Sequence, residues 1–497
     1  MCAEGSNPPG HRPAAAIGSL LLLVILAGPL LVLALDLIEL VATAQTAGAR
    51  GVLSFGRQLG LLVNSAVFAG AVTAASTAIG VGAASLLWSF AGRAGIVIAL
   101  ALLSMIALPP YLHALAWQSL AVHLSDMLEG LDLAPIRFSG WGAAWWSQTM
   151  ALVPVSTGLA LLGCLSVECT LFEAARMMRP DVTAFRKTVL PLAASWIWAS
   201  AGFVFLYTLV DYSVPSAFQK NTYALEIFAE FSTTYDTGRV MLVSLPFLAF
   251  SVAVLALILW RVRQVPVKLA LSGTCGGPAP QWPAWMLLLQ GTAGALLLLH
   301  ALAPVIGLGI QVGTPSALLG ITAEAGPEMS TSFRASALAA MISVPLAVMA
   351  ARRIARGAWV WLLLVLLPLA VPGPLIGIGL IALWNRAWFA PLYDSEAILV
   401  ATNITRFLPL ATLVMLARLK RIDPSMADAT RVFMPGRGRA WLQVTVPTMM
   451  NSALAAMFLV FALSLAELPA TILTVPPGQS TMAVRIYGYL HYGASSS

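Results

Sequence analysis

Two short stretches of this 497-residue sequence place a carboxylate, two small residues and an arginine next to one another. They are Glu173, Ala174, Ala175 and Arg176, and Asp428, Ala429, Thr430 and Arg431. Small side chains on a short helix allow another protein to approach closely, and a carboxylate offers that protein a charged hydrogen-bond acceptor. One such stretch alone would carry no weight, because Ala and Glu are simply good helix formers, but two matching copies are hard to obtain by chance.

The residues that follow each stretch predict the local structure of the loop that contains it. A break comes first, at Arg179 and Pro180 in one case and at Pro435 and Gly436 in the other. A proline then opens the next apolar run, and these prolines are Pro191 and Pro447. Proline is well tolerated in the first turn of a helix, where its missing N–H would have no partner. We expect each loop to form a short helix, a sharp turn and a second short helix before the chain enters the next long helix.

A second group of residues interrupts or ends long apolar runs. Its members are Asp211, Glu467, Pro109, Pro110, Pro372 and Pro374. Broken membrane helices often flank a transport pathway, and ionisable residues near membrane helices are often functional. These six are candidate pathway or gate residues. Two simpler readings stay open, because acids at helix ends are often just solvated and prolines often make packing kinks.

Other chemistries find no support in the sequence. There is no G-x-x-x-x-G-K-[ST] motif, so the chain does not hydrolyse ATP by that mechanism and a separate subunit must do so. No His, Cys and Asp cluster has the spacing of a catalytic or metal site, so we expect no cofactor, no metal and no enzymatic activity. His113 follows one proline break. We expect it to form a hydrogen bond between packed helices rather than to face a cavity.

Composition predicts the class of protein. Hydrophobic residues make up 59% of the chain and charged residues 9%, far below the roughly 25% charged residues of soluble domains. Apolar runs recur that are long enough to cross a bilayer, and they greatly exceed the ~10-residue strands of a membrane barrel. Only helices or closed barrels satisfy their backbone groups in lipid. We therefore expect an all-α polytopic membrane protein.

Eleven membrane spans can be placed in the sequence. They lie near 14–40, 60–89, 95–122, 145–167, 190–210, 239–260, 284–312, 332–351, 358–384, 396–417 and 447–466. With a cytoplasmic N-terminus, 18 of the 27 Lys and Arg residues fall in the cytoplasmic loops. This bias is typical of the cytoplasmic side of membrane proteins, so the net charge of +7 does not point to nucleic acid.

The chain contains an internal repeat. Pro109 and Pro372 are 263 residues apart, Asp211 and Glu467 are 256 apart, and the Thr222 and Thr481 that open TYALEIF and TMAVRIY are 259 apart. Near-constant offsets indicate two parallel halves. The first half is expected at 1–263 with six spans and the second at 284–497 with five, without a counterpart of the sixth. A Gly- and Pro-rich cytoplasmic linker at 264–283 joins them.

The two loops resemble the EAA loops of binding-protein-dependent ABC importer permeases, the MetI-like superfamily. The whole chain is most similar to the fused, two-half permeases of the ferric-iron type. DYSVPSAFQKNTYALEIF from Asp211 and ELPATILTVPPGQSTMAVRIY from Glu467 resemble the family's segment after the fifth helix of each half. The loops depart from the family pattern where Arg179 and Met434 replace its glycine, and the first loop is one residue shorter than the second.

The resemblance implies a function and partners. A chain of this kind is the permease subunit of an importer in the bacterial inner membrane, and it forms the substrate pathway. It docks two copies of an ABC ATPase subunit through its two loops, which here centre on Glu173 and Asp428. It receives substrate from a periplasmic or lipid-anchored binding protein and is surrounded by membrane lipid. The substrate implied is ferric iron or another small solute, such as thiamine, a polyamine, sulfate or a phosphonate.

An ion-coupled secondary transporter with two parallel repeats is the alternative. Such transporters usually bury ionisable residues inside the membrane for ion coupling. The expected spans are nearly free of charge at their centres, and their acids gather at the ends, as Asp36, Glu39, Asp211 and Glu467 do. This pattern favours a transporter energised from outside the membrane.

Overall fold

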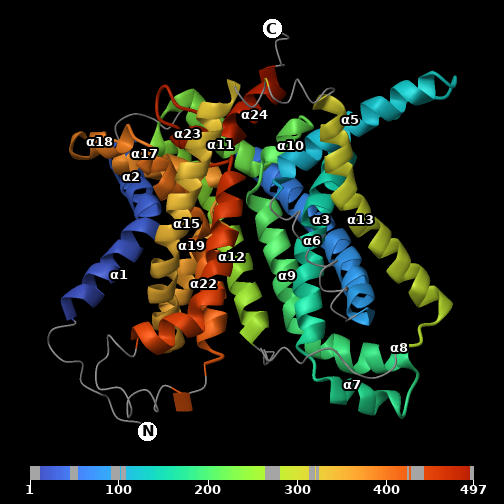
Figure 1. The fold of residues 1–497 in the computed structure, drawn as a ribbon. Coiled ribbons are helices and arrows are strands. Elements are labelled where there is room, and N and C mark those ends of the chain that lie inside the picture. The colour runs from blue at the N-terminus through green and yellow to red at the C-terminus, as the bar shows by residue number, and fades with distance from the viewer. Residues whose placement is uncertain are drawn as a thin grey trace. The chain divides into compact units, whose positions relative to one another are not determined.

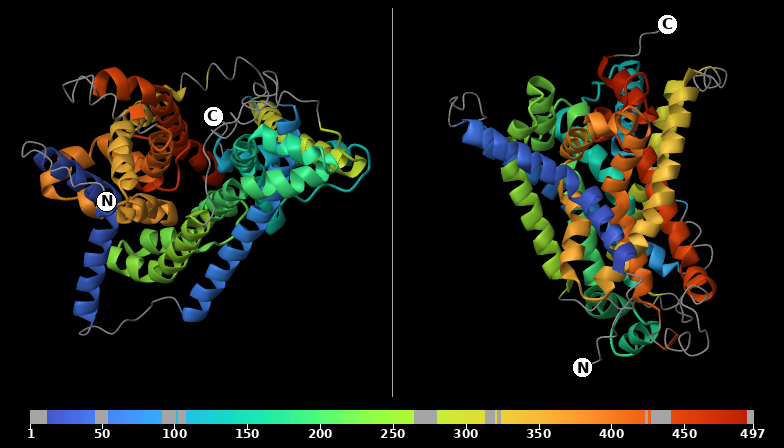
Figure 2. Two further views of the ribbon diagram at one scale, coloured as in Figure 1. Left: turned by 90° about the horizontal axis from the view of Figure 1, so that it is seen from below. Right: turned by 90° about the vertical axis from the view of Figure 1, so that its left-hand side faces the viewer.

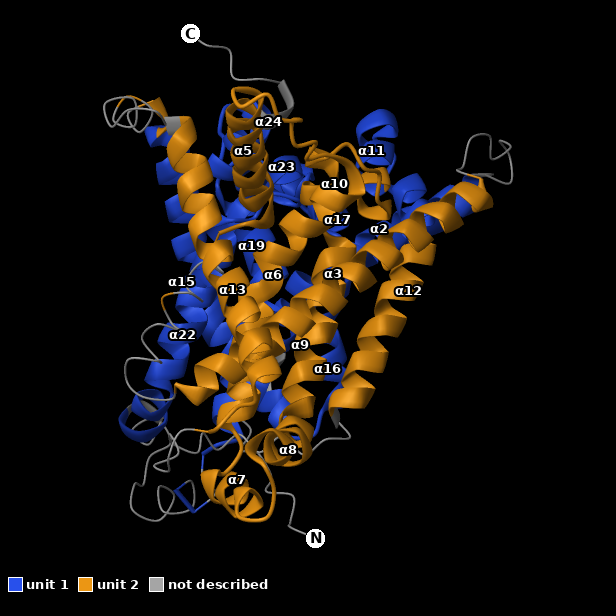
Figure 3. Cartoon of the chain, turned by 90° about the vertical axis from the view of Figure 1, so that its right-hand side faces the viewer, with its two compact units in different colours: residues 1–52, 227–244, 326–489 blue, residues 53–226, 245–325, 490–497 orange. Residues whose placement is uncertain are grey.

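The computed structural model describes residues 12–44, 54–90, 101, 108–263, 280–312, 320, 324–422, 425–426 and 441–492. The elements of these residues are all helices (Figure 1), which confirms the all-α class. Contacts divide the chain into two compact units, which Figure 3 shows in different colours. Unit 1 comprises residues 1–52, 227–244 and 326–489, and unit 2 comprises residues 53–226, 245–325 and 490–497.

Unit 2 contains the helices around the first predicted docking loop. They are α3 (Phe55–Ser89), α5 (Pro110–Glu129), α6 (Gly140–Leu165), α7 (Cys169–Arg176), α8 (Asp181–Ala184), the π-helical turn η3 (Phe185–Val189), α9 (Leu190–Val210), α10 (Ser213–Ala217) and α13 (Ala284–Val312). Helices α11 (Tyr223–Thr234) and α12 (Thr237–Arg263) begin in one unit and end in the other.

Unit 1 contains the helices of the second predicted half and the first helices of the chain. They are α1 (Arg12–Leu26), α2 (Gly28–Ala44), α15 (Gly326–Ala355), α16 (Trp359–Leu366), η4 (Leu367–Ala370), α17 (Gly373–Trp384), η5 (Ala387–Phe389), α18 (Ala390–Tyr393), α19 (Ala397–Leu419), the π-helical turn η6 (Trp441–Thr445), α22 (Val446–Leu465), α23 (Thr471–Thr474) and α24 (Met482–Tyr492).

The described helices include eight that are long and apolar enough to cross a membrane. The number rises to ten if each of two bent pairs counts as one span. One pair is bent by 59° between residues 18–26 and 28–43, and the other by 108° between residues 359–370 and 373–384. The predicted span near 95–122 begins in residues outside the described part, and α5 covers its later portion. The chain is thus a multi-pass membrane protein.

The compact units do not follow the predicted repeat boundary, because the helices at the start of each predicted repeat pack in the unit that contains most of the other repeat. In unit 1, α2 contacts α17 so closely that a Cβ on Gly379 would lie 2.7 Å from the carbonyl oxygen of Pro29. In unit 2, a Cβ on Gly307 of α13 would lie 2.4 Å from the carbonyl oxygen of Ala116 in α5. The division into halves at 1–263 and 284–497 stays a prediction about the sequence repeat, and residues 264–279 of its linker lie outside the described residues.

Small residues let the long helices approach one another. Helix α3 lies against α6 at Gly80, where a Cβ would lie 2.5 Å from that of Ser156. In unit 1 the core between α15, α19 and α22 is rich in buried alanines, including Ala339, Ala347 and Ala411. Close backbone contact supplies van der Waals packing where lipid removes most of the hydrophobic driving force.

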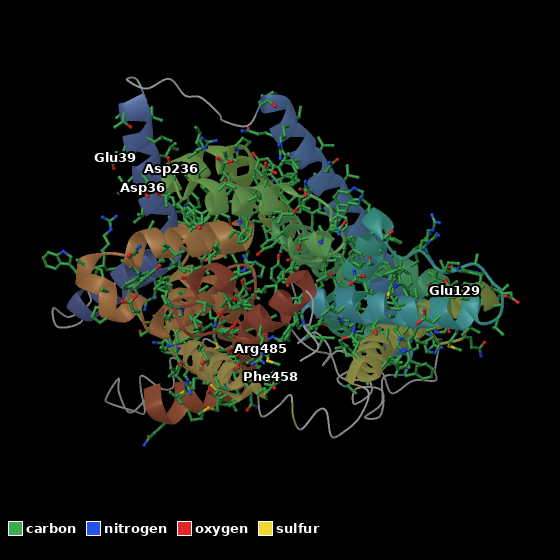
Figure 4. The ribbon with its side chains drawn as sticks, turned by 90° about the horizontal axis from the view of Figure 1, so that it is seen from above. Asp36, Glu39, Glu129, Asp236, Phe458 and Arg485 are labelled. Atoms are coloured by element: carbon green, nitrogen blue, oxygen red, sulfur yellow. The ribbon has the colours of Figure 1, made fainter. Side chains whose placement is uncertain are left out.

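Large apolar side chains point outward from several helices. Val67 of α3 is 65% exposed, Leu288 of α13 is 70% exposed and Phe458 of α22, labelled in Figure 4, is 69% exposed. A water-soluble protein rarely exposes so much contiguous apolar surface. In a chain with eight to ten candidate spans, we expect these faces to contact lipid.

Candidate functional site

The first predicted loop forms α7, a turn and α8, which confirms the expected short helix, sharp turn and second short helix. In Figure 1 both helices lie beyond the lower ends of α6 and α9, and the right-hand view of Figure 2 shows this teal-green part of the chain at the bottom. Pro180 occupies the position just before α8, where its extended backbone (ψ 146°) ends the turn. The loop therefore sits at one end of the helices of unit 2.

Helix α7 is amphipathic, and its inner face is anchored on aromatic rings. Phe172 is 2% exposed and meets Trp88 of α3 edge-on, with ring centroids 4.9 Å apart. Phe185 of η3 also contacts Trp88, at 5.4 Å, and meets Trp282 edge-on at 5.6 Å. Aromatic pairs contribute about 0.5–1.5 kcal/mol beyond the burial of their area. The loop is therefore fastened to the end of α3.

A bidentate ion pair bridges the turn between α7 and α8. Arg176 donates from Nε to Oδ1 of Asp181 at 2.9 Å and from Nη2 to Oδ2 at 3.0 Å. The guanidinium also lies over the Phe172 ring, 5.4 Å from its centroid. The second carboxylate oxygen accepts the backbone N–H of Gln281 at 2.6 Å. Bidentate Arg–carboxylate pairs fix geometry as well as charge, so Arg176 positions the turn.

The outer face of α7 is apolar and exposed. Leu171 is 45% exposed, Ala174 is exposed, and Met177 and Met178 at the end of the helix are each 87% exposed. Glu173 is half-buried beside them. Methionine is flexible and polarisable and is common on surfaces that bind other proteins. The sequence argument missed the two methionines, which lie in the turn directly after α7.

The second predicted loop lies almost wholly outside the described residues, including Asp428, Ala429, Thr430 and Arg431. The residues that follow this loop, η6 and the start of α22, are described. Pro447 is the second residue of α22 and follows η6, just as Pro191 is the second residue of α9 and follows η3. A proline ring clashes with the carbonyl four residues earlier. A widened π turn just before each proline relieves that clash, and such turns are frequent at functional sites.

Asp211 and Glu467 are buried at the far ends of α9 and α22, with 4% and 6% exposure. The Oδ1 atom of Asp211 accepts the backbone N–H of Ser213 at 3.1 Å and the Ser213 hydroxyl at 2.8 Å. The Oε1 atom of Glu467 accepts the backbone N–H of Ala470 at 3.0 Å. Neither acid is simply solvated. Each carboxylate orders the chain immediately after its long helix.

Arg406 lies inside α19 and was not among the residues that sequence analysis selected. It is 7% exposed, its Nε lies 3.5 Å from Oε2 of Glu467, and its Nη1 donates to the carbonyl oxygen of Val371 at 3.1 Å. Val371 lies in the 108° break between η4 and α17. The guanidinium therefore joins α19, the broken span and the segment after α22. The signal for it was a single charge in the apolar run 397–416.

The predicted break at Pro372 and Pro374 is confirmed as a sharp bend and not a mild kink. Pro372 precedes α17, Pro374 is in its first turn, and Gly373 between them is so close to the next segment that a Cβ would lie 2.5 Å from Cβ of Pro469. In unit 2, Pro109 precedes α5 and Pro110 is its first residue. The two proline pairs thus each start a helix.

A paired contact recurs in each unit, at the starts of α11 and α24. In unit 2, the Ser65 hydroxyl accepts the first N–H of α11 from Tyr223, and Arg57 lies 2.8 Å from Glu226. Burial, followed by the Glu226 charge, raises the pKa of Tyr223 to about 12, so its phenol stays neutral.

Unit 1 repeats this contact with the charges exchanged. The Ser332 hydroxyl accepts the N–H of Met482, and Arg485, labelled in Figure 4, lies 2.8 Å from Glu328. In unit 2 the acidic residue of the ion pair is on the short helix α11, whereas in unit 1 the basic residue is on the short helix α24.

His113 of α5 and His300 of α13 stack on one another inside unit 2. Both are 0% exposed, and their rings are 5.0 Å apart and tilted by only 17°. Among the described residues, neither ring nitrogen of His113 makes a hydrogen bond. The expected helix-packing hydrogen bond of His113 is therefore wrong, because its neighbour across the helix contact is another imidazole face.

We expect the double variant His113→Phe, His300→Phe to be as stable as the parent or more stable. Each buried polar group without a partner costs about 1–3 kcal/mol, and phenyl rings keep the stacking without that cost. The free energy of unfolding of the purified protein, measured by denaturant titration, checks this. A loss of more than about 2 kcal/mol would show that the imidazoles make interactions that phenyl rings cannot replace.

Comparison with known proteins finds a relative among transport permeases. The chain is 24% identical over 447 residues, 87% of its own length and 84% of the relative's, to the Fe(3+)-transport system permease protein FbpB 2 of Haemophilus influenzae. No family model and no solved structure matches the chain. Within the described residues no group of three or more His, Cys, Asp or Glu side chains is placed to hold a metal ion. Over most of its length the chain is therefore homologous to a protein named as a ferric-iron transport permease.

Proposed function

We propose that this chain is the fused permease subunit of an ABC importer of the bacterial inner membrane, with a cytoplasmic N-terminus, and that its first loop couples it to a separate ATPase subunit. The observation that carries the proposal is an exposed apolar surface, formed by Leu171 and Ala174 of α7 and by Met177 and Met178 in the turn after it. An apolar face of this kind is suited to dock in a groove on a partner. Glu173 beside it supplies a charged acceptor.

The way in which α7 is held supports the same role. Phe172 fastens the helix to Trp88 at the end of α3, and Arg176 locks the turn through Asp181. A force applied to the exposed face would therefore reach α3 and α9 as rigid-body motion. We propose that the counterpart around Asp428, Ala429, Thr430 and Arg431, which lies outside the described residues, docks a second copy of the ATPase.

Ferric iron is the substrate that we propose, because the relative with 24% identity is named as an Fe(3+)-transport permease. A periplasmic or lipid-anchored binding protein would deliver it. The chain's own contribution is then to open and close a pathway. We place that pathway beside the proline-started helices at Pro109, Pro110, Pro372 and Pro374 and beside the segments that Asp211 and Glu467 order.

Negative charges on the exposed apolar surface at α7 should prevent the ATPase subunit from binding to this chain. We expect the double variant Met177→Glu, Met178→Glu to lose co-purification with the ATPase and to lose ATP hydrolysis that depends on loaded binding protein. The reason is that two carboxylates would be desolvated in an apolar contact. The measurement is pull-down of the ATPase by tagged permease in mild detergent, followed by an ATPase assay.

Met127→Glu is the matched control, because Met127 of α5 is 67% exposed but lies outside the loop. It should co-purify as the parent does. Full ATPase binding by the Met177, Met178 variant would contradict the assignment of this face. An absence of any P-loop ATPase from the parent complex would contradict the proposed function itself.

A further inference from the structure

Unit 2 contains an open groove of about 610 Å³ that the proposed transport function does not use. It runs between α3, α9 and the beginning of α13, and α8 and η3 form one end of it. Its volume lies within the roughly 300–1,000 Å³ of small-molecule sites. The wall includes Ala74, Ala78, Val81, Leu190, Ala201 and Leu289.

The groove offers a ligand an almost wholly apolar wall. The hydroxyls of Thr73 and Ser85, which line it, are bonded within α3, where they donate to the carbonyl oxygens of Ala69 and Gly82, each at 2.7 Å. Ala78 and Leu289 are exposed along it. Since α3, α9 and α13 all belong to candidate membrane spans, the apolar material available to this wall is the acyl chain of a lipid.

One end of the groove is cationic. Arg186 of η3 lines it and is exposed, and among the described residues its guanidinium forms no ion pair. Arg176 in the same loop is by contrast neutralised by Asp181. Trp285 at the start of α13, 59% exposed, also lines this end. Exposed tryptophan beside arginine at a helix end is typical of the headgroup level of a membrane.

We propose that the groove binds one anionic phospholipid, with an acyl chain along α3 and α9 and its phosphate at Arg186. A guanidinium matches phosphate oxygens in a bidentate manner. Cations at the membrane surface select anionic over neutral lipids. Because Val182 and Phe185 of the loop line the same groove, the bound lipid would contact the segment that joins α7 to the membrane helices.

The test is lipid binding to the purified full-length chain by native mass spectrometry, with dioleoyl phosphatidylglycerol and dioleoyl phosphatidylcholine as probes. Arg186→Gln should weaken the first phosphatidylglycerol adduct about fivefold or more, as the loss of one surface cation predicts. Arg186→Lys should restore much of it. Ala78→Trp should remove the adduct by filling the groove.

Two matched controls distinguish lipid binding in the groove from the effects of removing any cation or adding any bulky side chain. Arg179→Gln removes an exposed cation of the same loop outside the groove, and Val67→Trp adds the same bulk to an exposed position of α3 outside it. Both should bind phosphatidylglycerol as the parent does. Parent-like binding by Arg186→Gln and Ala78→Trp, equal affinity of the parent for the two lipids, or an equal loss in Arg179→Gln would each overturn the proposal.

Discussion

Arg406→Met should destabilise the protein by about 3–5 kcal/mol, the cost of leaving a buried charge without its partner. Glu467 is 6% exposed and would keep its carboxylate in the interior opposite a methionine. The carbonyl of Val371 in the bent span would also lose its donor. The measurement is the free energy of unfolding of the purified permease in a denaturant titration.

The paired variant Arg406→Met, Glu467→Gln distinguishes a buried charge from lost packing. Glutamine keeps an oxygen for the N–H of Ala470 and removes the negative charge, so the double variant should recover most of the lost stability. Arg334→Met is the control on the neighbouring α15, since Arg334 pairs with Glu396 in an exposed contact that solvent screens. If Arg406→Met proved as mild as Arg334→Met, the buried pair would have no role in holding the bend.

Phe172→Ala should uncouple ATP hydrolysis from transport. The substitution removes the ring that packs on Trp88 and costs about 3–5 kcal/mol of packing free energy, concentrated at the attachment of α7. Helix α7 would still present Leu171 and the two methionines, so the ATPase should still bind. We expect ATP hydrolysis to continue while uptake into proteoliposomes is lost.

Phe218→Ala is the matched control for Phe172→Ala. Phe218 is 6% exposed and meets Phe138 edge-on at 5.6 Å, at the other end of α9 from the loop. It should lower stability by a similar amount and leave uptake per ATP hydrolysed unchanged. An equal fall of that ratio in both variants would mean that Phe172 acts through general stability only.

Sequence patterns were sufficient for the features that depend on neighbours along the chain. The class of protein followed from hydropathy, the helix–turn–helix of the first loop from Pro180, and the broken span from Pro372 and Pro374. Each is a local effect of side-chain chemistry on the backbone, either by apolar length or by a missing N–H. The described residues of the loop lie where these patterns place them.

Features that depend on tertiary packing could not be predicted in this way. Arg406 and Glu467 are 61 residues apart, and their contact exists only because the segment after α22 folds back on α19. His113 and His300 are 187 residues apart (300 − 113) and meet because α13 packs on α5. Hydropathy and residue spacing do not predict which helices pack against one another. A lone arginine in an apolar run was the only signal available.

The most direct test of the account is uptake of radioactive ferric iron into proteoliposomes that contain the permease, with the energy source varied. We predict uptake that requires ATP, the ATPase subunit and the loaded binding protein together, and that persists when proton and sodium gradients are collapsed. Uptake driven by an ion gradient without the ATPase would contradict the account and favour a secondary transporter with two parallel repeats.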